Sequence, residues 1–199
     1  MSLHPFNRDT LPVTPWKNGG GSTCEIACWP PGAGLGDFGW RVSIARIAVA
    51  GPFSIFDGVD RHIMLLDGDG VRLQSVEAGI DHALDKPYQP FVFNGDVAID
   101  CTLLGGASSD FNVMVRRGLW RAEVQVLEQA ASLTSIPHGV LMGLRGSWRL
   151  ERACNDGSFN ALSMCQADEG LCWTEDAHAW QVTPLVSGAK LLVVRFTKG

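Results

Sequence analysis

The feature that most constrains the fold of this sequence is a succession of short apolar or alternating segments, each ended by turn-forming residues. The 199 residues include 23 glycines and 10 prolines, and no 3.6-residue apolar period persists for twelve positions. Strands of four to eight residues separated by such turns are typical of β-sandwiches and barrels. The sequence therefore predicts an all-β fold with little helix.

The expected strands are defined by apolar runs or strict alternation. They occupy residues 40–47, 52–56, 62–66, 71–75, 91–93, 97–104, 111–115, 123–127, 140–144, 148–151, 161–165, 171–174, 179–185 and 191–196. A further strand is expected after the glycines near the N-terminus, at residues 23–28.

Two stretches resemble copies of one unit. "MLLDGDGVRL" at 64–73 and "MGLRGSWRL" at 142–150 each indicate a strand, a glycine-bearing hairpin turn and a second strand. An aromatic strand follows each at a similar distance, 25 positions from Gly68 to Phe93 and 27 from Gly146 to Trp173. We expect one domain made of two β-barrel halves, approximately residues 1–120 and 121–199, that share a core.

The charge balance bears on possible partners. Sixteen Lys and Arg against 21 Asp and Glu give a net charge of −5. Because nucleic acids and anionic membranes bind basic surfaces, this balance predicts neither as a partner. The first 21 residues lack the features of a signal peptide, and no run approaches the length of a membrane helix.

The cysteines bear on the compartment. Six cysteines, at positions 24, 28, 101, 154, 165 and 172, are scattered without a C-x-x-C pair. In a chain of this length without an export signal, that pattern predicts reduced thiols in a cytoplasmic protein.

The stretch "PWKNGGGSTCEI" at 15–26 combines an aromatic residue, hydrogen-bond donors and three glycines. Its Lys precedes the glycines and a strand follows, so the pattern excludes a phosphate-binding loop, in which a helix follows the Lys. Two interpretations stay open: a plain turn into the first strand, or the wall of a ligand site. In the second, Trp16 is an apolar wall, Lys17 and Asn18 donate, and Glu25 lies on the site-facing side of the strand.

Polar residues also interrupt apolar strands. In "WRVSIA", a period of two places Arg41 and Ser43 on the face opposite Trp40. Arg61 begins an apolar strand and Asn112 lies inside another. A buried guanidinium requires a carboxylate from the protein or from a ligand, whereas an arginine at the rim keeps its head in water.

The sequence offers no metal or nucleophile signature. The five histidines, at positions 4, 62, 82, 138 and 178, never lie within four residues of one another, so we predict no metal. There is no G-x-S-x-G motif and no Cys/His signature. Glu25, Asp57, Asp60 and Asp110 could still converge as paired carboxylates, although Asp57 is explained equally well as a turn residue.

Four segments resemble the HutD/Ves family of cupin-like bacterial proteins: "PWKNGGGSTCEI", "FGWRVSIARIAVAGPFSIFDGVDRHIMLLDGDGVRL", "PFVFNGD" and "DFNVMVRRG". The resemblance covers nearly the whole chain, is denser up to about Gly118, and is closer to the Ves branch. It implies an RmlC-like double-stranded β-helix arranged as a bicupin. The HutD branch implies an accessory or regulatory role in histidine utilisation, and the Ves branch a role in stress response.

These observations predict a protein that binds a small carboxylate metabolite without a metal or other cofactor. The resemblance makes urocanate or formylglutamate the first candidates. The predicted ligand-binding residues are Trp16, Lys17, Asn18, Glu25, Arg41, Ser43, Arg61 and Asn112. We expect a binding protein rather than an enzyme. The alternatives are a metal-independent isomerase or lyase acting on a small carboxylate, and a structural or protein-interaction module; a homodimer formed through a sheet edge is compatible with the sequence.

Overall fold

The computed structural model describes residues 2–153, 159–175 and 177–199, which form β-strands and a single 3-10 turn, η1 (Arg8–Thr10). The all-β prediction is confirmed. The strands are β1 (Ser2–Asn7), β2 (Val13–Pro15), β3 (Gly21–Trp29), β4 (Trp40–Ile47), β5 (Gly51–Pro52), β6 (Val59–Asp67), β7 (Val71–Ser75), β8 (Ile80–Leu84), β9 (Phe91–Asn94), β10 (Asp100–Leu103), β11 (Ser108–Arg116), β12 (Trp120–Leu127), β13 (Ala131–Ile136), β14 (His138–Arg145), β15 (Ser147–Ala153), β16 (Phe159–Gln166), β17 (Glu169–Thr174), β18 (His178–Pro184) and β19 (Lys190–Lys198).

The chain divides into two compact units. Residues 11–121 together with Gly199 form one, which we call the N-terminal barrel, and residues 1–10 and 122–198 form the other, the C-terminal barrel. The two expected halves assigned residues 1–10 to the first barrel. They lie instead in the C-terminal barrel, because β1 pairs along its length with β17, from Ser2 opposite Thr174 to Asn7 opposite Glu169.

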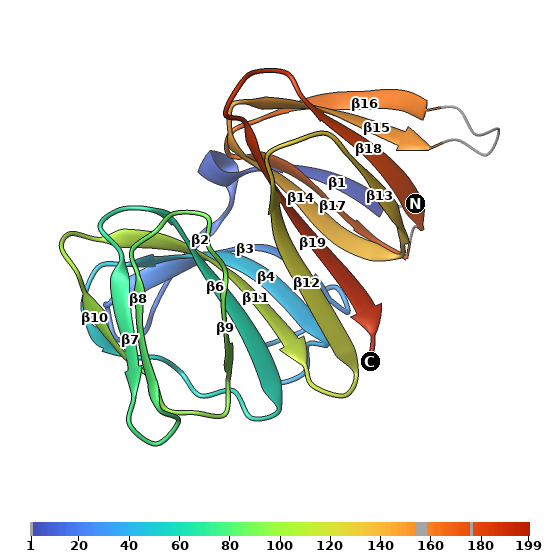
Figure 1. The fold of residues 1–199 in the computed structure, drawn as a ribbon. Helices are drawn as coiled ribbons and strands as arrows, with labels where there is room; N and C mark the ends of the chain where they lie inside the picture. The colour runs from blue at the N-terminus through green and yellow to red at the C-terminus, as the bar shows by residue number, and fades with distance from the viewer. Residues whose placement is uncertain (1, 154–158, 176) are drawn as a thin grey trace. The chain divides into compact units, whose positions relative to one another are not determined.

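The N-terminal barrel consists of two antiparallel sheets (Figure 1). The larger has the order β2-β3-β4-β11-β6-β9 and the smaller has the order β5-β10-β7-β8. Strand β11 is the centre of the larger sheet: it pairs with β4 on one side and with β6 on the other.

The C-terminal barrel repeats this topology. Its sheets have the orders β1-β17-β14-β19-β12 and β13-β18-β15-β16. Eight strands correspond one to one, because β4-β11-β6-β9 matches β12-β19-β14-β17 and β5-β10-β7-β8 matches β13-β18-β15-β16. The hairpins β6-β7 and β14-β15 are the two stretches that resemble each other in sequence. The duplication predicted from them is therefore present in the fold.

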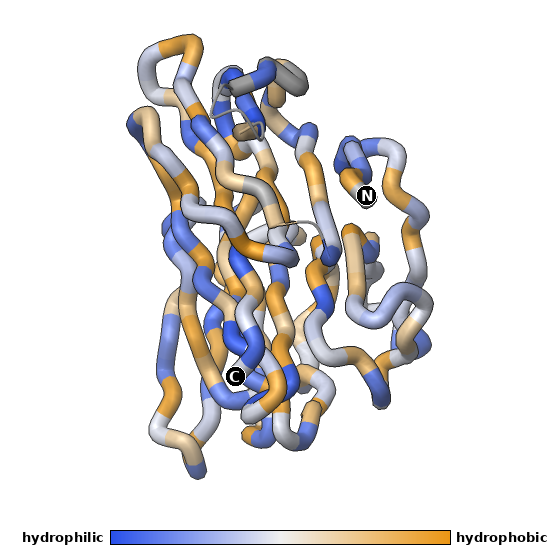
Figure 2. The backbone as a smooth tube through the Cα atoms, turned by 90° about the vertical axis from the view of Figure 1, so that its right-hand side faces the viewer, coloured by the Kyte–Doolittle hydropathy of each residue, from blue (hydrophilic) through white to orange (hydrophobic). Residues whose placement is uncertain are grey.

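Each barrel has an apolar core between its sheets. Hydrophobic and hydrophilic residues alternate along many strands, as Figure 2 shows, which is the pattern of a strand with one face toward a core. Ile63, Leu65, Leu73 and Cys101 belong to the core of the N-terminal barrel, where each is at most 2% exposed. The largest fully buried side chains include four tryptophans. Trp148, Trp173 and Trp180 belong to the core of the C-terminal barrel, and Trp40 lies in β4.

The strand predictions are wrong at one segment and incomplete at others. Of the expected strand 52–56, only Pro52 lies in a strand, β5, and residues 53–58 form a loop. Phe53 and Phe56 are three positions apart and both pack inward from this loop, a spacing that a strand would not allow. The strands β1, β2, β8 and β13 were not predicted, because polar residues or prolines interrupt their apolar alternation.

Candidate functional site

The glycine-rich stretch forms the hairpin turn between β2 and β3. The backbone N–H of Trp16 donates to the carbonyl of Gly21 at 2.9 Å, and the N–H of Gly19 donates to the carbonyl of Trp16 at 3.0 Å. The side chain of Asn18 accepts a hydrogen bond from the N–H of Gly20 at 3.0 Å. A Cβ at Gly21 would lie 2.1 Å from the carbonyl oxygen of Arg46, so only glycine fits there.

This geometry explains most of the stretch by its local structure. Lys17 and Asn18 are exposed, and the amide of Asn18 is used within the turn. Trp16 packs against the core of the N-terminal barrel, and its indole N–H donates to Thr23 Oγ1 at 2.7 Å. The role of Lys17 and Asn18 in ligand binding remains a prediction.

The other predicted residues lie on neighbouring strands of the larger sheet. In one row across the sheet, Glu25 pairs with Ser43 and Ser43 with Asn112. In the next row, Arg41 and Arg61 both oppose Met114, one from each side of β11. Because side chains two positions apart share a face, these polar groups are on the same side as the core residue Ile63, toward the interior of the barrel.

Arg41 is compensated within the protein. Its Nε donates to Glu25 Oε2 at 2.6 Å and its Nη1 donates to Ser43 Oγ at 3.3 Å. The Arg41 side chain is 14% exposed and that of Glu25 is 42% exposed, so the pair lies at an edge of the interior that solvent reaches. The expectation that a buried Arg41 would need a carboxylate is confirmed by this ion pair.

Arg61 is buried without such a carboxylate. The residue is 8% exposed, its Nη2 donates to Asn112 Oδ1 at 3.2 Å, and its Nε has no partner. Its Cζ lies 5.2 Å from the ring centre of Phe53, 5.6 Å from that of Phe56 and 5.0 Å from that of Phe93. No ion pair links Arg61 to an acidic side chain among the residues that the structure describes.

Three aromatic faces offset part of the charge, but they leave its hydrogen bonds unmade. Cation–π contacts stabilise a guanidinium without accepting its N–H groups in line. Burial, followed by the nearby positive charge of Arg41, lowers the pKa of Arg61 to about 10. Since the group remains charged at neutral pH, the interior holds a cation with a free donor, which an anion would satisfy.

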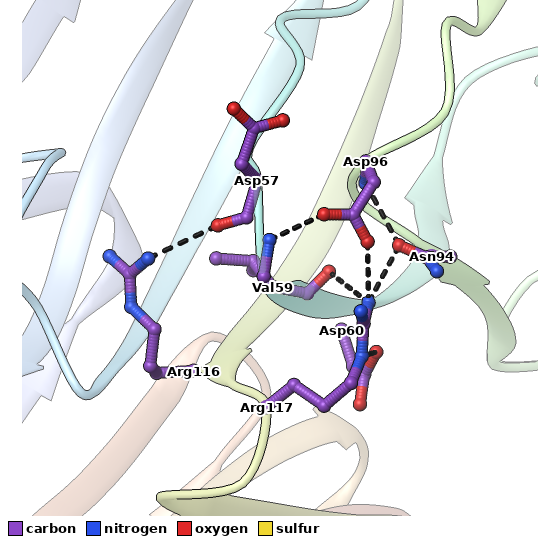
Figure 3. Close-up of polar contacts among 8 residues, drawn as sticks. Asp57, Val59, Asp60, Asn94, Asp96, Arg116 and Arg117 are labelled. Atoms are coloured by element: carbon purple, nitrogen blue, oxygen red, sulfur yellow. Dashed lines mark hydrogen bonds and ion pairs between the residues drawn. The ribbon is translucent and has the colours of Figure 1, made fainter.

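A charged network lies at the same end of the barrel, where β6 begins and β9 and β11 end (Figure 3). Arg117 donates from Nε to Asp60 at 2.8 Å, and from Nη2 to Asn94 at 2.6 Å and to Asp96 at 2.8 Å. Arg116 donates from Nη1 to the carbonyl oxygen of Asp57 at 3.1 Å. The network links three loops: residues 53–58 between β5 and β6, residues 95–99 between β9 and β10, and residues 117–119 between β11 and β12.

Besides Arg61, the interior of this barrel contains a buried ionisable side chain on β11, that of Asp110. It is 0% exposed, and neither of its carboxyl oxygens has a hydrogen-bond partner. Burial, and then the charge of Asp67, raises its pKa to about 7. Cys101 of the facing sheet is close enough for burial and the charge of Asp110 to raise its thiol pKa to about 12.

The four carboxylates considered for a paired site do not share one setting. Glu25 pairs with Arg41, Asp60 pairs with Arg117, Asp57 contributes its backbone carbonyl, and Asp110 lies in the core.

Within the described residues, no three His, Cys, Asp or Glu side chains gather as a metal-ligand set. Cys24, Cys28, Cys101, Cys165 and Cys172 are free thiols, while Cys154 is outside the described residues. None of the described helical residues forms a segment long and apolar enough to cross a bilayer.

Two features were not predicted from the sequence: the aromatic cover of Arg61, formed by Phe53, Phe56 and Phe93, and the charged network around Arg117. Phe53 and Phe56 were assigned to a strand, and their spacing of three was the signal for a loop that folds both rings inward. Asp110 could have been placed with Asn112, because two positions along an extended strand share a face. The partners of Arg117 come from segments 21 and more residues away, so no local pattern reveals them.

The structure also has a groove of about 380 Å³ in the C-terminal barrel, lined by β1, β16 and β17 residues including Phe6, Met164, Glu169 and Leu171. Its charged residue, Glu169, accepts a hydrogen bond from the backbone of Gln166 at 2.9 Å. Because this groove holds no unpartnered buried cation, we place the candidate site at Arg61.

Two sheets closed around a core, with eight strands repeated in a second barrel, define a cupin-like double-stranded β-helix of the two-barrel type. The profile of the HutD family matches residues 8–192, and the chain belongs to this family. Protein Ves of Citrobacter koseri is 40% identical over 174 residues, 87% of this chain and 84% of that protein. Protein Ves of Escherichia fergusonii is 35% identical over 188 residues, 94% of this chain and 90% of that protein.

Solved structures agree with this assignment. A conserved protein of unknown function from Pseudomonas aeruginosa PAO1 has a TM-score of 0.82 and 32% identity, with 98% of this chain and 99% of that chain covered. HutD from Pseudomonas fluorescens SBW25 has a TM-score of 0.80 and 27% identity, with both chains fully covered. An oxalate decarboxylase of Bacillus subtilis, at 8% identity and a TM-score of 0.63 over 98% of this chain and 78% of that one, shares the fold.

Proposed function

We propose that this protein binds a small carboxylate inside the N-terminal barrel, with Arg61 as the residue that neutralises it. The observation that carries the proposal is the buried guanidinium of Arg61, which has a free Nε–H and no acidic partner among the described side chains. A carboxylate accepts two parallel N–H bonds from a guanidinium, so it matches the donors that remain.

Neighbouring groups supply orientation and selectivity. Asn112 holds Nη2 of Arg61, and its own Nδ2 donates to the carbonyl of Asp110 at 3.2 Å, which fixes the amide. Arg41 adds positive potential although Glu25 already pairs with it. The three phenylalanine rings around Arg61 favour a guest with a flat or apolar body next to its carboxylate.

The biological role that follows is regulatory or accessory. A family with a HutD branch makes intermediates of histidine breakdown, such as urocanate or formylglutamate, the first ligands to test. A protein that holds such a carboxylate without transforming it would sense or sequester it. The similarity to Protein Ves makes carboxylates from outside histidine utilisation the next ligands to test.

Titration calorimetry tests the proposal with formate, acetate, urocanate and formylglutamate, each against its uncharged amide. We expect heat from at least one carboxylate, none from its amide, and loss of binding by more than about 30-fold in Arg61→Met, because a desolvated charged hydrogen bond is lost. Arg72→Met is the matched control, since Arg72 forms an exposed ion pair with Asp81 in the same barrel. Equal binding by wild type and Arg61→Met would rule the proposal out.

A metal-independent enzyme is a second candidate, favoured by one observation. Asp110 is a buried carboxyl on the interior face of the barrel with its pKa raised to about 7, which suits a general acid or base. Incubating each carboxylate that binds with wild type and with Asp110→Asn, followed by NMR in D2O, separates the two. Turnover or deuterium incorporation that needs Asp110 would establish an enzyme, and an unchanged ligand would leave the binding protein.

A further inference from the structure

The aromatic cover over Arg61 has one part held in a sheet and one part held by a loop. Phe93 belongs to β9, which pairs with β6 directly opposite Arg61. Phe53 and Phe56 belong to the loop at residues 53–58, which has no strand assignment. Because Arg61 is only 8% exposed, an anion from solvent must displace part of its cover, and the loop is the part without a sheet to hold it.

Few backbone hydrogen bonds hold this loop. The N–H of Phe53 donates to the carbonyl of Ile99 and that of Phe56 donates to the carbonyl of Gly95, both at 2.8 Å. The N–H of Gly58 donates to the carboxylate of Asp96. All three acceptors lie in the connection between β9 and β10, and Arg116 Nη1 also donates to the carbonyl of Asp57 at 3.1 Å, so the loop opens when it separates from that connection and from Arg116.

Arg117 contacts this junction in two ways: its backbone reaches the loop, and its side chain holds Asp96, which accepts the N–H of Gly58. Its backbone N–H donates to the carbonyl of Gly58 at 2.8 Å, and its side chain pairs with Asp96 at 2.8 Å and with Asp60 at 2.8 Å. The pKa of Asp96 is lowered first by the N–H of Gly58 and then by Arg117, so both act on one carboxylate. Figure 3 shows the Arg117 head between Asp96, Asn94 and Asp60.

We propose that Arg117 is a positioning residue of the anion site: it fastens the loop at residues 53–58 over Arg61, and release of this loop admits the anion. The anion in this inference rests on the proposed function, whereas the role of Arg117 in holding the loop does not. The side chains of Arg117, Asp60 and Asp96 are 42%, 39% and 33% exposed, so their contacts are individually weak and suited to frequent opening.

The first experiment needs no ligand. Hydrogen exchange of the amides of Phe56 and Gly58 is compared in wild type, Arg117→Ala and the control Arg72→Ala, which breaks an ion pair of similar exposure between β7 and β8. We expect these amides to exchange roughly tenfold faster in Arg117→Ala and at the wild-type rate in Arg72→Ala, with Arg117→Lys in between. Unchanged exchange in Arg117→Ala contradicts the fastening role.

A second variant guards against a folding defect. Asp96→Asn keeps an acceptor for Gly58 but removes the charge that faces Arg117, and it should accelerate the same amides by a smaller factor. The amide of Cys101 in β10 reports on the whole barrel and should remain protected in every variant. If Arg117→Ala exposes Cys101 as well, Asp96→Asn alone decides the question.

The second experiment uses formate and acetate as probes. The association and dissociation rates from NMR line shapes should both rise in Arg117→Ala by roughly the factor seen in exchange, and Kd should change less than about twofold, because the opening step precedes both processes. If neither anion binds wild type, the proposed function fails for these ligands while the exchange result stands. If they bind with unchanged rates although the loop amides exchange faster, the loop is not the route and the inference is overturned.

Discussion

The two barrels share one strand order but differ in what fills them. Arg61 in β6 opposes Phe93, and the equivalent residue in β14, Gly139, opposes Trp173. A Cβ at Gly139 would lie 2.3 Å from the Trp173 ring, so indole occupies the space that a side chain would need. The same strand topology therefore builds either a charged interior or a solid one.

The comparison extends along the central strands. Asn112 opposes Ile63 in the N-terminal barrel, and its counterpart Val193 opposes Leu141 in the other. Both Val193 and Leu141 are 0% exposed. At the position of Asn112 the C-terminal core therefore has an apolar side chain, and this difference supports a proposed ligand site in the N-terminal barrel.

The two barrels also differ in how an interior arginine is compensated. Arg195, on the interior side of β19, pairs with Glu123 at 2.8 Å and donates to Thr134 at 3.1 Å. Arg61 has an amide and aromatic rings instead. A guanidinium with a carboxylate partner has its charge compensated within the protein, whereas one without such a partner keeps a free N–H donor for an anion at the expense of stability.

The largest expected effect concerns Asp110. In the unfolded chain its carboxyl ionises near 3.8, whereas in the folded protein its pKa is about 7, so the folded state binds more protons between these values. Stability contributed by this group therefore falls as the pH rises from about 4 to about 7, by on the order of 4 kcal/mol. Urea unfolding of wild type and Asp110→Asn across this window should show a gain for the variant that grows with pH and then levels off.

Asp81→Asn is the control for that experiment. Asp81 is exposed and its pKa is lowered, chiefly by the hydrogen bond from Arg72. Its contribution should have the opposite sign, being lost as the pH falls. A pH-independent difference between Asp110→Asn and wild type would contradict the buried ionisation.

The next largest effect tests the filled barrel. Gly139→Ala should destabilise the protein by about 2–3 kcal/mol, because the new methyl group would overlap Trp173 and approach the carbonyl of Val194 to 2.8 Å. Gly51→Ala is the matched control, as its Cβ meets nothing within 4 Å. Thermal and urea unfolding measure both, and an unaffected Gly139→Ala would mean that the C-terminal interior has free space.

A smaller effect, of opposite sign, is expected at Arg61. Arg61→Met should raise the free energy of unfolding by about 1–2 kcal/mol in the absence of ligand, since a buried cation without a counter-ion is replaced by an apolar chain of similar length. Arg195→Met should lower it slightly, because Glu123 loses its partner. If both variants lose stability equally, the contrast between the two arginines is not real.

The smallest effects belong to the glycine-rich turn. Asn18→Ala should reduce stability by about 0.5–1 kcal/mol through the lost bond to Gly20, and Lys17→Ala by less than about 0.5 kcal/mol. Neither should change carboxylate binding in calorimetry. Weaker binding in Lys17→Ala would return this exposed residue to the ligand site.

The sequence was sufficient for the features that depend on local pattern. The hairpins at residues 64–73 and 142–150, the β class and the repeat follow from alternation and from glycine at turns. The shared face of Arg41 and Ser43 follows from the period of two. Strand β13 (Ala131–Ile136) was missed because it pairs with the distant β18, and β8 (Ile80–Leu84) was missed because His82 interrupts the apolar alternation of Ile80 and Leu84, although its partner β7 is adjacent in sequence.

The candidate site was predictable in part for the same reason. Interrupted apolar strands pointed to Arg61 and Asn112, which the fold brings into contact. They did not show that Glu25 would neutralise Arg41 and leave Arg61 without a carboxylate, since this depends on the bulge between Glu25 and Ala27 and on strand order. The difference between Arg41, which has a carboxylate partner, and Arg61, which has none, therefore depends on the tertiary structure.

The pairing of β1 with β17 has a consequence for biosynthesis. Ser2 leaves the ribosome long before Thr174, its partner across the sheet, has been made. The N-terminal barrel has nearly all its residues between positions 11 and 121, so its pairings can be completed while the rest is still being translated. The first strand to emerge is therefore among the last to find its place, and until then it must remain unpaired outside a nascent chain that is already partly folded.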